Sequence, residues 1–378
     1  MSQIDAKAEL FDENTENCGL PLTALLRCLS LERIANEIEK QYYKPHHFHY
    51  PVVLLLKLLI IMRYRKLSFR KVMFSLTEDD LENILTTEQI KAGLQLPSGK
   101  TLHHFVCYRL GETGIEWLMK ELGKELTHLL NHRHIEDEGM TLIVDSTPLE
   151  ASRYSKVSPY NVYYEIHMDK LHITMADGYP VCCMFSDGLA NDAPYGRDLM
   201  KMAAEFNPKV ADVLADGGYD NVLMYADIYA NFGIIPAIRM RENSVFNPDG
   251  SRMNIKKTVN KLWKRGGDMK KPVEEQITYL YSLQTRGKEK PEKFKELAGA
   301  YLRNQAFINY DNVLSRLNER GLCERRHAQF KNVMKFNVKG YREESRKLYI
   351  FLDFIAIQCM FLTYLQNHSQ NTNLAGYV

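Results

Sequence analysis

The spacing of hydrophobic positions divides the chain into a helical first third and a mixed remainder. From about residue 22 to 134, apolar side chains recur every three or four positions, which is typical of amphipathic helices. Ser68 and Thr77 stand where helix N-caps are expected, and acids follow Thr77 in the first turn. We therefore expect an all-helical N-terminal region, preceded by an acidic segment over residues 1–21.

Strand-like runs begin after Gly139. The apolar run Met140–Val144 is bounded by turn-formers and acids, which indicates a buried strand. Further strands are expected from β-branched and aromatic content at Val162–His167, Leu171–Met175, Pro180–Phe185, Val210–Ala215 and Ile234–Ile238. Helices are expected between the later strands, at Asn191–Phe206 and Asn221–Ala230. Three strands in series followed by alternation predict an α/β core with a mixed sheet.

Helical periodicity returns near the end of the chain. Asn312–Val333 is polar and basic, whereas Ser345–Leu365 is strongly apolar. The second run approaches the ~20 residues that a transmembrane helix needs, but it contains Asp353 and Gln358. The earlier apolar run Val52–Met62 is too short to span a bilayer. We interpret both runs as buried core helices and expect no membrane partner.

Acidic and basic side chains are concentrated in different segments of the chain, although their total numbers nearly balance. The chain has 378 residues and a formal net charge of only +2, which taken alone argues against a polyanionic partner. Residues 251–300, however, hold thirteen basic and six acidic side chains, and residues 1–20 hold five acids and one lysine. Trp263 lies in the basic segment beside Lys264 and Arg265. A basic segment with one aromatic side chain could bind DNA or a nucleotide that is flipped out of the duplex. A solvent-exposed charged hairpin with a packed Trp explains the same pattern equally well.

Cysteine usage indicates a reducing compartment. The count of seven is odd, no pair forms C-x-x-C, and the first twenty residues lack the apolar core of a signal peptide. We expect a cytoplasmic protein with free, reduced thiols.

A turn at Pro97–Thr101 leads into a short predicted helix, Leu102–Leu110. With Lys100 and His103 beside it, this segment suggests a helix-turn-helix that contacts DNA. A helical bundle with ordinary surface charges explains the same pattern equally well.

Two aspartates follow predicted strands of the α/β core. Asp145 comes directly after Thr141–Val144, and Asp216 directly after Val210–Ala215. Open α/β sheets place their ligands at such carboxyl ends. If the two strands are neighbours, the carboxylates repel unless a cation lies between them, and an oxygen-rich site of this kind suits Mg²⁺ or Mn²⁺.

A third acid, Glu324, stands in a basic helical segment. Arg320, Glu324 and Lys331 follow at intervals of four and seven residues, which places them on one stripe of a helix. Such a stripe offers one more metal ligand flanked by two phosphate contacts, and the adjacent Arg325 adds a further basic group. Two metal ions ~3.5–4 Å apart serve phosphoryl transfer in sites of this composition. The alternative is that the aspartates are turn residues and Glu324 a surface ion-pair partner.

Three segments resemble the catalytic blocks of the DDE transposases of bacterial and archaeal insertion sequences. They are IVDSTPLEAS, LADGGYDN with GIIPAIRMREN, and RGLCERRHAQFK. The family's third block reads Tyr, two residues, Arg, three residues, Glu, six residues, Lys, and this chain departs only at the Tyr, where it has Leu317. The resemblance runs from about residue 50 to 365. Lys170, His172 and Asp192 stand in segments similar to those near the family's active site, although Asp192 equally fits a helix N-terminus.

The resemblance implies an RNase H-like mixed-sheet core, with Asp145 on its first strand, Asp216 on its fourth and Glu324 on a late helix. It also implies two Mg²⁺ ions held by these carboxylates, with Mn²⁺ expected to substitute. The implied organisation is a DNA-binding helical region over 22–135 and a catalytic domain over 136–243 and 306–378, interrupted by a basic insertion over 244–305.

The expected function is DNA cleavage at the terminal inverted repeats of the element and strand transfer to target DNA. Because strand transfer needs two ends held together, we expect a homodimer on double-stranded DNA. Two alternatives remain open: a transposase-derived DNA-binding protein without catalysis, and an RNase H-like repair nuclease.

Overall fold

The computed structural model describes residues 21–43, 50–134, 139–151, 155, 158–240, 275, 278, 291–334 and 343–374. The acidic segment 1–20 and most of the basic segment 244–305 lie outside these ranges.

The N-terminal region is all-helical, as the periodicity predicts. Its helices are α3 (Leu22–Cys28), α4 (Glu32–Tyr42), α5 (Val52–Tyr64), α6 (Phe69–Val72), α7 (Glu78–Ile84), α8 (Thr87–Lys91) and α9 (Gly99–His104). Ser68 caps α6 by accepting from the Lys71 amide, and Thr77 forms a reciprocal capping box with Asp80 at α7. Helix α9 continues through a π-helical turn, Phe105–Leu110, into the long helix α10 (Gly111–Arg133).

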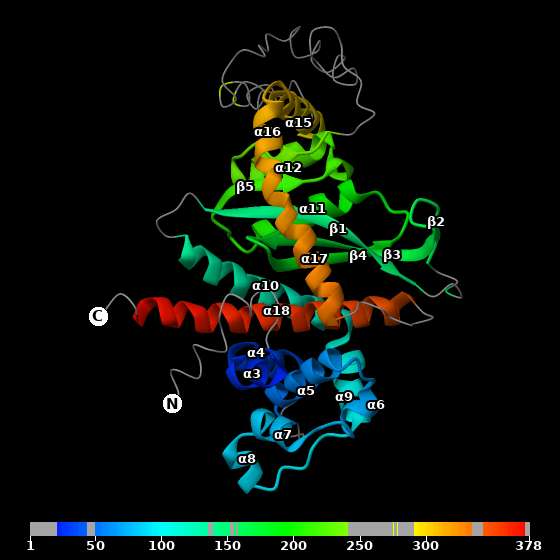
Figure 1. The fold of residues 1–378 in the computed structure, drawn as a ribbon, viewed down its shortest axis with the longest axis vertical. Coiled ribbons are helices and arrows are strands. Elements are labelled where there is room, and N and C mark those ends of the chain that lie inside the picture. Colours follow the sequence, from blue (N-terminus) through cyan, green and yellow to red (C-terminus); the bar gives the residue numbers. More distant parts are fainter. Residues whose placement is uncertain are drawn as a thin grey trace.

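A mixed sheet forms the centre of the molecule (Figure 1). Its strands are β1 (Met140–Glu150), β2 (Tyr160–Asn161), β3 (Ile166–Ala176), β4 (Tyr179–Asp187), β5 (Val210–Ala215) and β6 (Ala237–Ile238). The spatial order β4-β3-β1-β5-β6 combines antiparallel β1, β3 and β4 with β5 and β6 parallel to β1. This is the strand order of an RNase H-like fold, so the expected fold class is confirmed.

Several strand predictions were wrong in their limits; the predicted strand Ile234–Ile238, for example, is only Ala237–Ile238 in the structure. Residues 162–165 form a turn, because Asn161 Oδ1 accepts the amide hydrogens of Tyr163 and Tyr164 and so replaces the strand pairing. β3 then runs unbroken from Ile166 to Ala176. β1 continues to Glu150 instead of stopping before Asp145, since it stays paired with β3 along its length.

Helices cover both faces of the sheet. Helices α11 (Asp192–Ala204) and α12 (Val222–Phe232) lie on one face, while α10 and α18 (Glu343–Leu374) lie on the other (Figure 1). The alternation of a strand separates two adjacent thiols: Cys182 Sγ is 3.7 Å from the Leu199 carbonyl of α11, and Cys183 Sγ is 3.2 Å from Met119 Sδ of α10. The six cysteines in the described ranges are free thiols.

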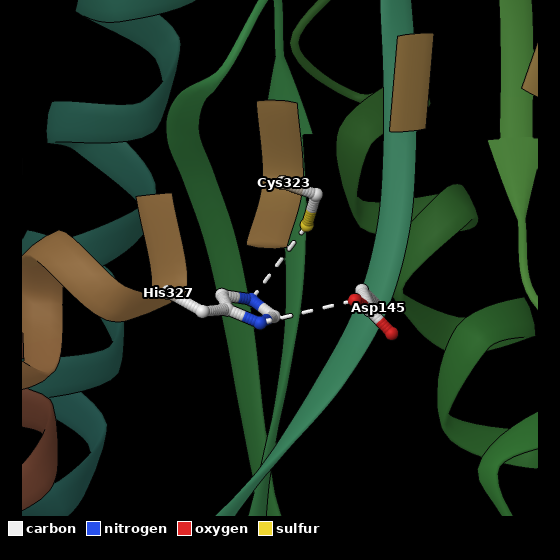
Figure 2. Close-up of side chains that lie close together, drawn as sticks. All are labelled: Asp145, Cys323 and His327. Atoms are coloured by element: carbon white, nitrogen blue, oxygen red, sulfur yellow. Dashed lines mark hydrogen bonds and ion pairs between the residues drawn. The ribbon is translucent and has the colours of Figure 1, made fainter. Parts of the chain in front are cut away.

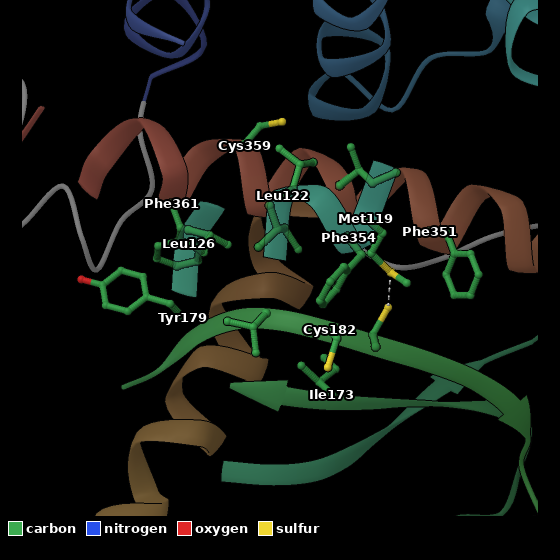
Figure 3. Close-up of a cluster of buried hydrophobic side chains, with 14 of the residues drawn as sticks. Met119, Leu122, Leu126, Ile173, Tyr179, Cys182, Phe351, Phe354, Cys359 and Phe361 are labelled. Carbon is green, nitrogen blue, oxygen red and sulfur yellow. Dashed lines mark hydrogen bonds between the residues drawn. The ribbon is translucent and has the colours of Figure 1, made fainter. Parts of the chain in front are cut away.

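The apolar C-terminal helix is part of the core. Figure 3 shows Phe351, Phe354 and Phe361 of α18 packed with α10 above the sheet. The segment Glu343–Asn367 is long and apolar enough to cross a membrane, but 89% of its most apolar window is buried inside the molecule. The buried position agrees with the expected core helix. Asp353, on this helix, is paired by both carboxylate oxygens with Arg63 of α5, at 2.5 and 2.9 Å.

The segment that carries the third predicted acid follows α15 (Pro291–Ile308). It consists of α16 (Tyr310–Leu317), a 3₁₀ turn (Asn318–Arg320) and α17 (Gly321–Met334), which runs from the β5 edge toward α18 (Figure 1). Arg316 binds both carboxylate oxygens of Asp212 on β5, which fixes the start of this segment against the sheet.

Candidate active site

The sheet register brings Asp145 and Asp216 together. β1 and β5 pair in parallel up to Val144 opposite Ala215, so the two aspartates occupy the next position on adjacent strands. Asp145 is only 7% exposed, and its Oδ1 accepts the Ser146 amide hydrogen at 2.9 Å. The expected neighbour relationship is therefore present, although Asp145 lies within β1 and not beyond its end.

Asp216 directly follows β5 and precedes a 3₁₀ turn, Gly217–Tyr219. Its side chain caps that turn by accepting the Gly218 amide hydrogen at 2.8 Å. A Cβ atom at Gly218 would lie 2.9 Å from Asp192 Oδ2 and 3.0 Å from Asp216 Oδ1. Glycine at this position lets the carboxylates of Asp192 and Asp216 approach from two sides.

The third acid and its arginine form an ion pair beside the aspartates. Arg320 donates to Glu324 Oε1 at 3.0 Å, in the i, i+4 relation that the sequence predicts. The Arg320 side chain is 18% exposed and that of Glu324 is 67% exposed. Glu324 therefore stands at the rim of the site, with its carboxylate directed to Arg320, whereas Asp145 lies at the base.

Electrostatics link these residues. Burial raises the pKa of Asp145 to about 6; the Arg320 charge opposes this rise and the Asp216 charge adds to it. Burial acts to lower the pKa of Arg320, but Asp145, Glu324 and Asp216 outweigh it and raise that pKa. One guanidinium thus interacts with all three predicted catalytic carboxylates.

Asp192 belongs to the same cluster. Its Oδ1 is 2.9 Å from Lys170 Nζ and 3.7 Å from His172 Nδ1, and the imidazole of His172 stacks on Tyr195 at 4.5 Å. Burial raises the pKa of Tyr219 well above its usual value, and Asp145, Asp192 and Asp216 all act in the same direction. The charges of three aspartates therefore act on one buried phenol.

Two further side chains reach Asp145 from α17. His327 Nδ1 is 3.8 Å from Asp145 Oδ2, and Cys323 Sγ is 3.7 Å from His327 Nε2 (Figure 2). Sequence reasoning passed over both residues, although their i, i+4 spacing in the third block was a usable signal. It also passed over Tyr164, whose pKa is raised by burial first and then by Tyr163, Asp192, Asp145 and Asp216.

An open pocket of about 260 Å³ adjoins the rim of the site. Arg239, at the end of β6, faces Leu314, Leu317, Arg320 and Glu324 across it. Leu317, where the sequence has leucine in place of the tyrosine of the resembling motif, is a wall of this pocket.

The predicted DNA contacts fall into three groups. Arg325 is exposed on α17 beside Glu324, and Lys331 lies on the same helix with a side chain outside the described part. Trp263, Lys264 and Arg265 lie outside the described residues. Lys100 and His103 are exposed on α9, in the helical layer across α18 from the sheet, so they are not part of the carboxylate cluster (Figure 1).

Comparisons with known proteins place this site in context. The family model described as "Transposase DDE domain" matches residues 136–359, a range that includes Asp145, Asp216 and Glu324. Among solved structures, the cryo-EM structure of the piggyBac transposase synaptic complex with hairpin DNA is similar at 12% identity and a TM-score of 0.35. The match covers 96% of this chain and 78% of that chain. No curated protein matches the chain.

Proposed function

Because this chain belongs to the transposase DDE domain family, we propose that it cuts DNA at the terminal inverted repeats of its own element and joins the freed 3′ end to target DNA. The observation that carries the proposal is the parallel register of β1 and β5, which sets Asp145 and Asp216 side by side under Arg320 and Glu324. Asp145, Asp216 and Glu324 are the proposed catalytic and metal-binding residues.

The residues present fit a hard divalent cation. Asp145 and Asp216 offer carboxylate oxygens from rigid strands, and the raised pKa of Asp145 reflects burial and a neighbouring negative charge. A cation at these oxygens relieves both costs, and oxygen donors select Mg²⁺ or Mn²⁺. Two Mg²⁺ ions bound by the three acids would supply activation of the attacking oxygen and stabilisation of the leaving oxygen.

The surrounding side chains position the DNA backbone. Arg320 has its guanidinium among the carboxylates and is placed to exchange one carboxylate for a phosphate oxygen. Glu324 is exposed and held by a single ion pair, so releasing it toward the aspartates costs little. Arg325 and Lys331 extend the positive charge along α17. Lys170 neutralises the charge of the neighbouring Asp192 through an ion pair.

The partner is double-stranded DNA, in the form of the terminal repeats and the target. Lys100 and His103 on α9 are proposed contacts outside the cutting site, and Trp263, Lys264 and Arg265 are proposed contacts from the basic insertion. Two ends must be held for joining, so a homodimer on DNA is part of the proposal. We place the protein in the prokaryotic cytoplasm, at the nucleoid.

A strand-transfer assay tests the proposal. The substrate is a duplex that carries the inverted repeat flanking the coding region, with a target plasmid and Mg²⁺. We expect a nick that leaves a 3′-hydroxyl, and joined product from a precut 3′-hydroxyl end but not from a 3′-deoxy end. Binding without metal-dependent cutting would instead assign a DNA-binding protein derived from a transposase. Cutting of generic DNA without joining would assign a nuclease.

A further inference from the structure

A second kind of metal-ligand cluster shares one carboxylate with the proposed catalytic site. Cys323 and His327 are one helical turn apart on α17; the Cys323 sulfur points at the His327 ring, and the ring points at Asp145 on β1 (Figure 2). All three residues are buried: Cys323 is 0% exposed, His327 8% and Asp145 7%. One donor atom from each residue lies within 4.8 Å of the other two.

The donor set differs in chemistry from the carboxylate set. A thiol and an imidazole are poor ligands for Mg²⁺, which prefers oxygen, but they are the preferred ligands of Zn²⁺ and of other borderline or soft divalent cations. Sulfur, nitrogen and oxygen from three protein residues, with a fourth position open to water, is a common composition for a four-coordinate Zn²⁺ site.

The distances are close to those that a tetrahedral ion requires. Zn–S bonds of about 2.3 Å and Zn–N bonds of about 2.0–2.1 Å put ligand atoms roughly 3.4–3.6 Å apart. Cys323 Sγ to His327 Nε2 is 3.7 Å, and His327 Nδ1 to Asp145 Oδ2 is 3.8 Å. These two distances use different nitrogens of the His327 ring, and only one of them can bind the ion. With one nitrogen chosen, the donor atoms lie within 4.8 Å of one another, so the pair that is farthest apart has to close by about 1 Å. That movement is within the reach of side-chain rotation on α17.

We propose that Asp145, Cys323 and His327 bind a thiophilic divalent cation such as Zn²⁺. On binding, the Cys323 sulfur–hydrogen bond is replaced by a sulfur–metal bond, and the proton leaves to solvent. His327 binds as the neutral imidazole. Asp145 contributes an oxygen that the Mg²⁺ site also needs, so the two kinds of ion exclude one another. The consequence, which rests on the proposed function, is that Zn²⁺ inhibits DNA cleavage in competition with Mg²⁺.

Cobalt titration of the full-length protein tests the binding directly. Co²⁺ is the probe because a thiolate–Co²⁺ bond gives a near-ultraviolet charge-transfer band that carboxylate ligands do not produce. We expect one such band in the wild type and in the control Cys107→Ser, which removes a half-buried thiol elsewhere, and no band in Cys323→Ser. His327→Asn keeps the thiol but should weaken Co²⁺ binding by at least about tenfold, the lower range for losing even a supporting partner of a metal site.

The inhibition is measured as the ratio of cleavage rates with and without Zn²⁺ at fixed Mg²⁺, each variant against its own uninhibited rate. We expect a higher Mg²⁺ concentration to relieve the inhibition. Half-maximal inhibition of Cys323→Ser should need at least tenfold more Zn²⁺ than that of the wild type. If circular dichroism shows that the serine variant misfolds, Cys323→Ala replaces it. A band that is absent from the wild type, or that persists in Cys323→Ser and Cys323→Ala, overturns the proposal. A Co²⁺ band in a protein that does not cleave DNA supports the metal site and refutes the proposed function instead.

Discussion

Arg320 donates a hydrogen bond to Glu324 at 3.0 Å, and its charge also acts on Asp145 and Asp216. One guanidinium therefore compensates acids from two strands and from the helical segment that crosses the sheet edge. The pair is weak because Glu324 is two-thirds exposed. Arg320 is thus an electrostatic support for the buried Asp145, and in the proposed function it exchanges Glu324 for a phosphate.

The pH dependence of cleavage should report this support. Asp145 must be ionised to bind metal, and its pKa is about 6, so at low Mg²⁺ the cleavage rate should fall as pH drops through about 6. Arg320→Ala removes the charge that lowers the pKa of Asp145, and should move the inflection to higher pH. Arg320→Lys keeps the charge and should leave the inflection near its original position. Rate–pH profiles at one subsaturating Mg²⁺ concentration measure this; an inflection that is unmoved or lower in Arg320→Ala would refute the electrostatic role.

Asp145 should also limit the stability of the fold. Its pKa is raised from an ordinary 3.8 to about 6, so its stabilising contribution is complete below the unfolded pKa and is lost as pH rises through about 6. The loss amounts to about 3 kcal/mol above that pH. Asp145→Asn removes the ionisable group and therefore this loss. The stability advantage of the variant over the wild type should accordingly be larger at pH 7.5 than at pH 5. Urea unfolding in EDTA at both pH values tests this, and an advantage that shrinks with pH would contradict it.

The contact between α10 and β4 depends on Gly123. A Cβ atom there would lie 2.1 Å from the Val181 carbonyl oxygen, so the helix would have to move off the sheet. We expect Gly123→Ala to cost about 1–3 kcal/mol of unfolding free energy. Gly321→Ala is the matched control: it is helical and has open space around its Cβ position, so it should be neutral or stabilising. Equal effects of the two substitutions in urea unfolding would show that the close approach is not limiting.

The buried pair Arg63–Asp353 should link the N-terminal helices to α18 and, through it, to the α/β core. Asp353 is fully buried, burial raises its pKa to about 6, and Arg63 opposes the rise. Asp353→Leu leaves the Arg63 charge buried without its partner and should cost about 3–5 kcal/mol. The double variant Arg63→Met with Asp353→Leu should recover most of that loss. A double-mutant cycle by urea unfolding measures the coupling, and purely additive losses would contradict it.

Much of the fold could be predicted from the sequence, because the limits of many helices and strands depend on neighbouring residues in the chain. The run Val210–Ala215 has the same limits in the structure as in the prediction, and the helix predicted to begin at Asn191 begins one residue later, with Asn191 as its N-cap. The misplaced limits involve long-range pairing. β1 continues past Asp145 and Pro148 because β3 pairs with it beyond the point where β5 stops. Val162, Tyr163 and Tyr164 are β-branched or aromatic, yet hydrogen bonds to the Asn161 side chain turn this segment out of the sheet.

The site was predictable only in part, because some of its contacts also join residues that are far apart in the sequence. Asp145 and Asp216 could be expected together once two parallel strands were assumed to be neighbours. Cys323 and His327 reach Asp145 only because α17 crosses the sheet edge, and no periodicity along the chain specifies that crossing. The carboxylates of Asp192 and Asp216 both lie beside Gly218, an arrangement that depends on the packing of α11.

Cleavage by matched glutamate variants tests the central claim most directly. Glu324 and Glu319 are both exposed, lie five residues apart on the same segment, and differ in that only Glu324 pairs with Arg320 beside the aspartates. A labelled terminal-repeat duplex with Mg²⁺ is incubated with the wild type, Glu324→Gln, Asp216→Asn and Glu319→Gln, after each variant is shown to be folded and to bind the duplex. We predict that Glu324→Gln and Asp216→Asn lose cleavage by at least about a hundredfold, on the scale of one electrostatic catalytic group, while Glu319→Gln cleaves like the wild type. Cleavage retained by Glu324→Gln or Asp216→Asn would contradict the assignment of the active site.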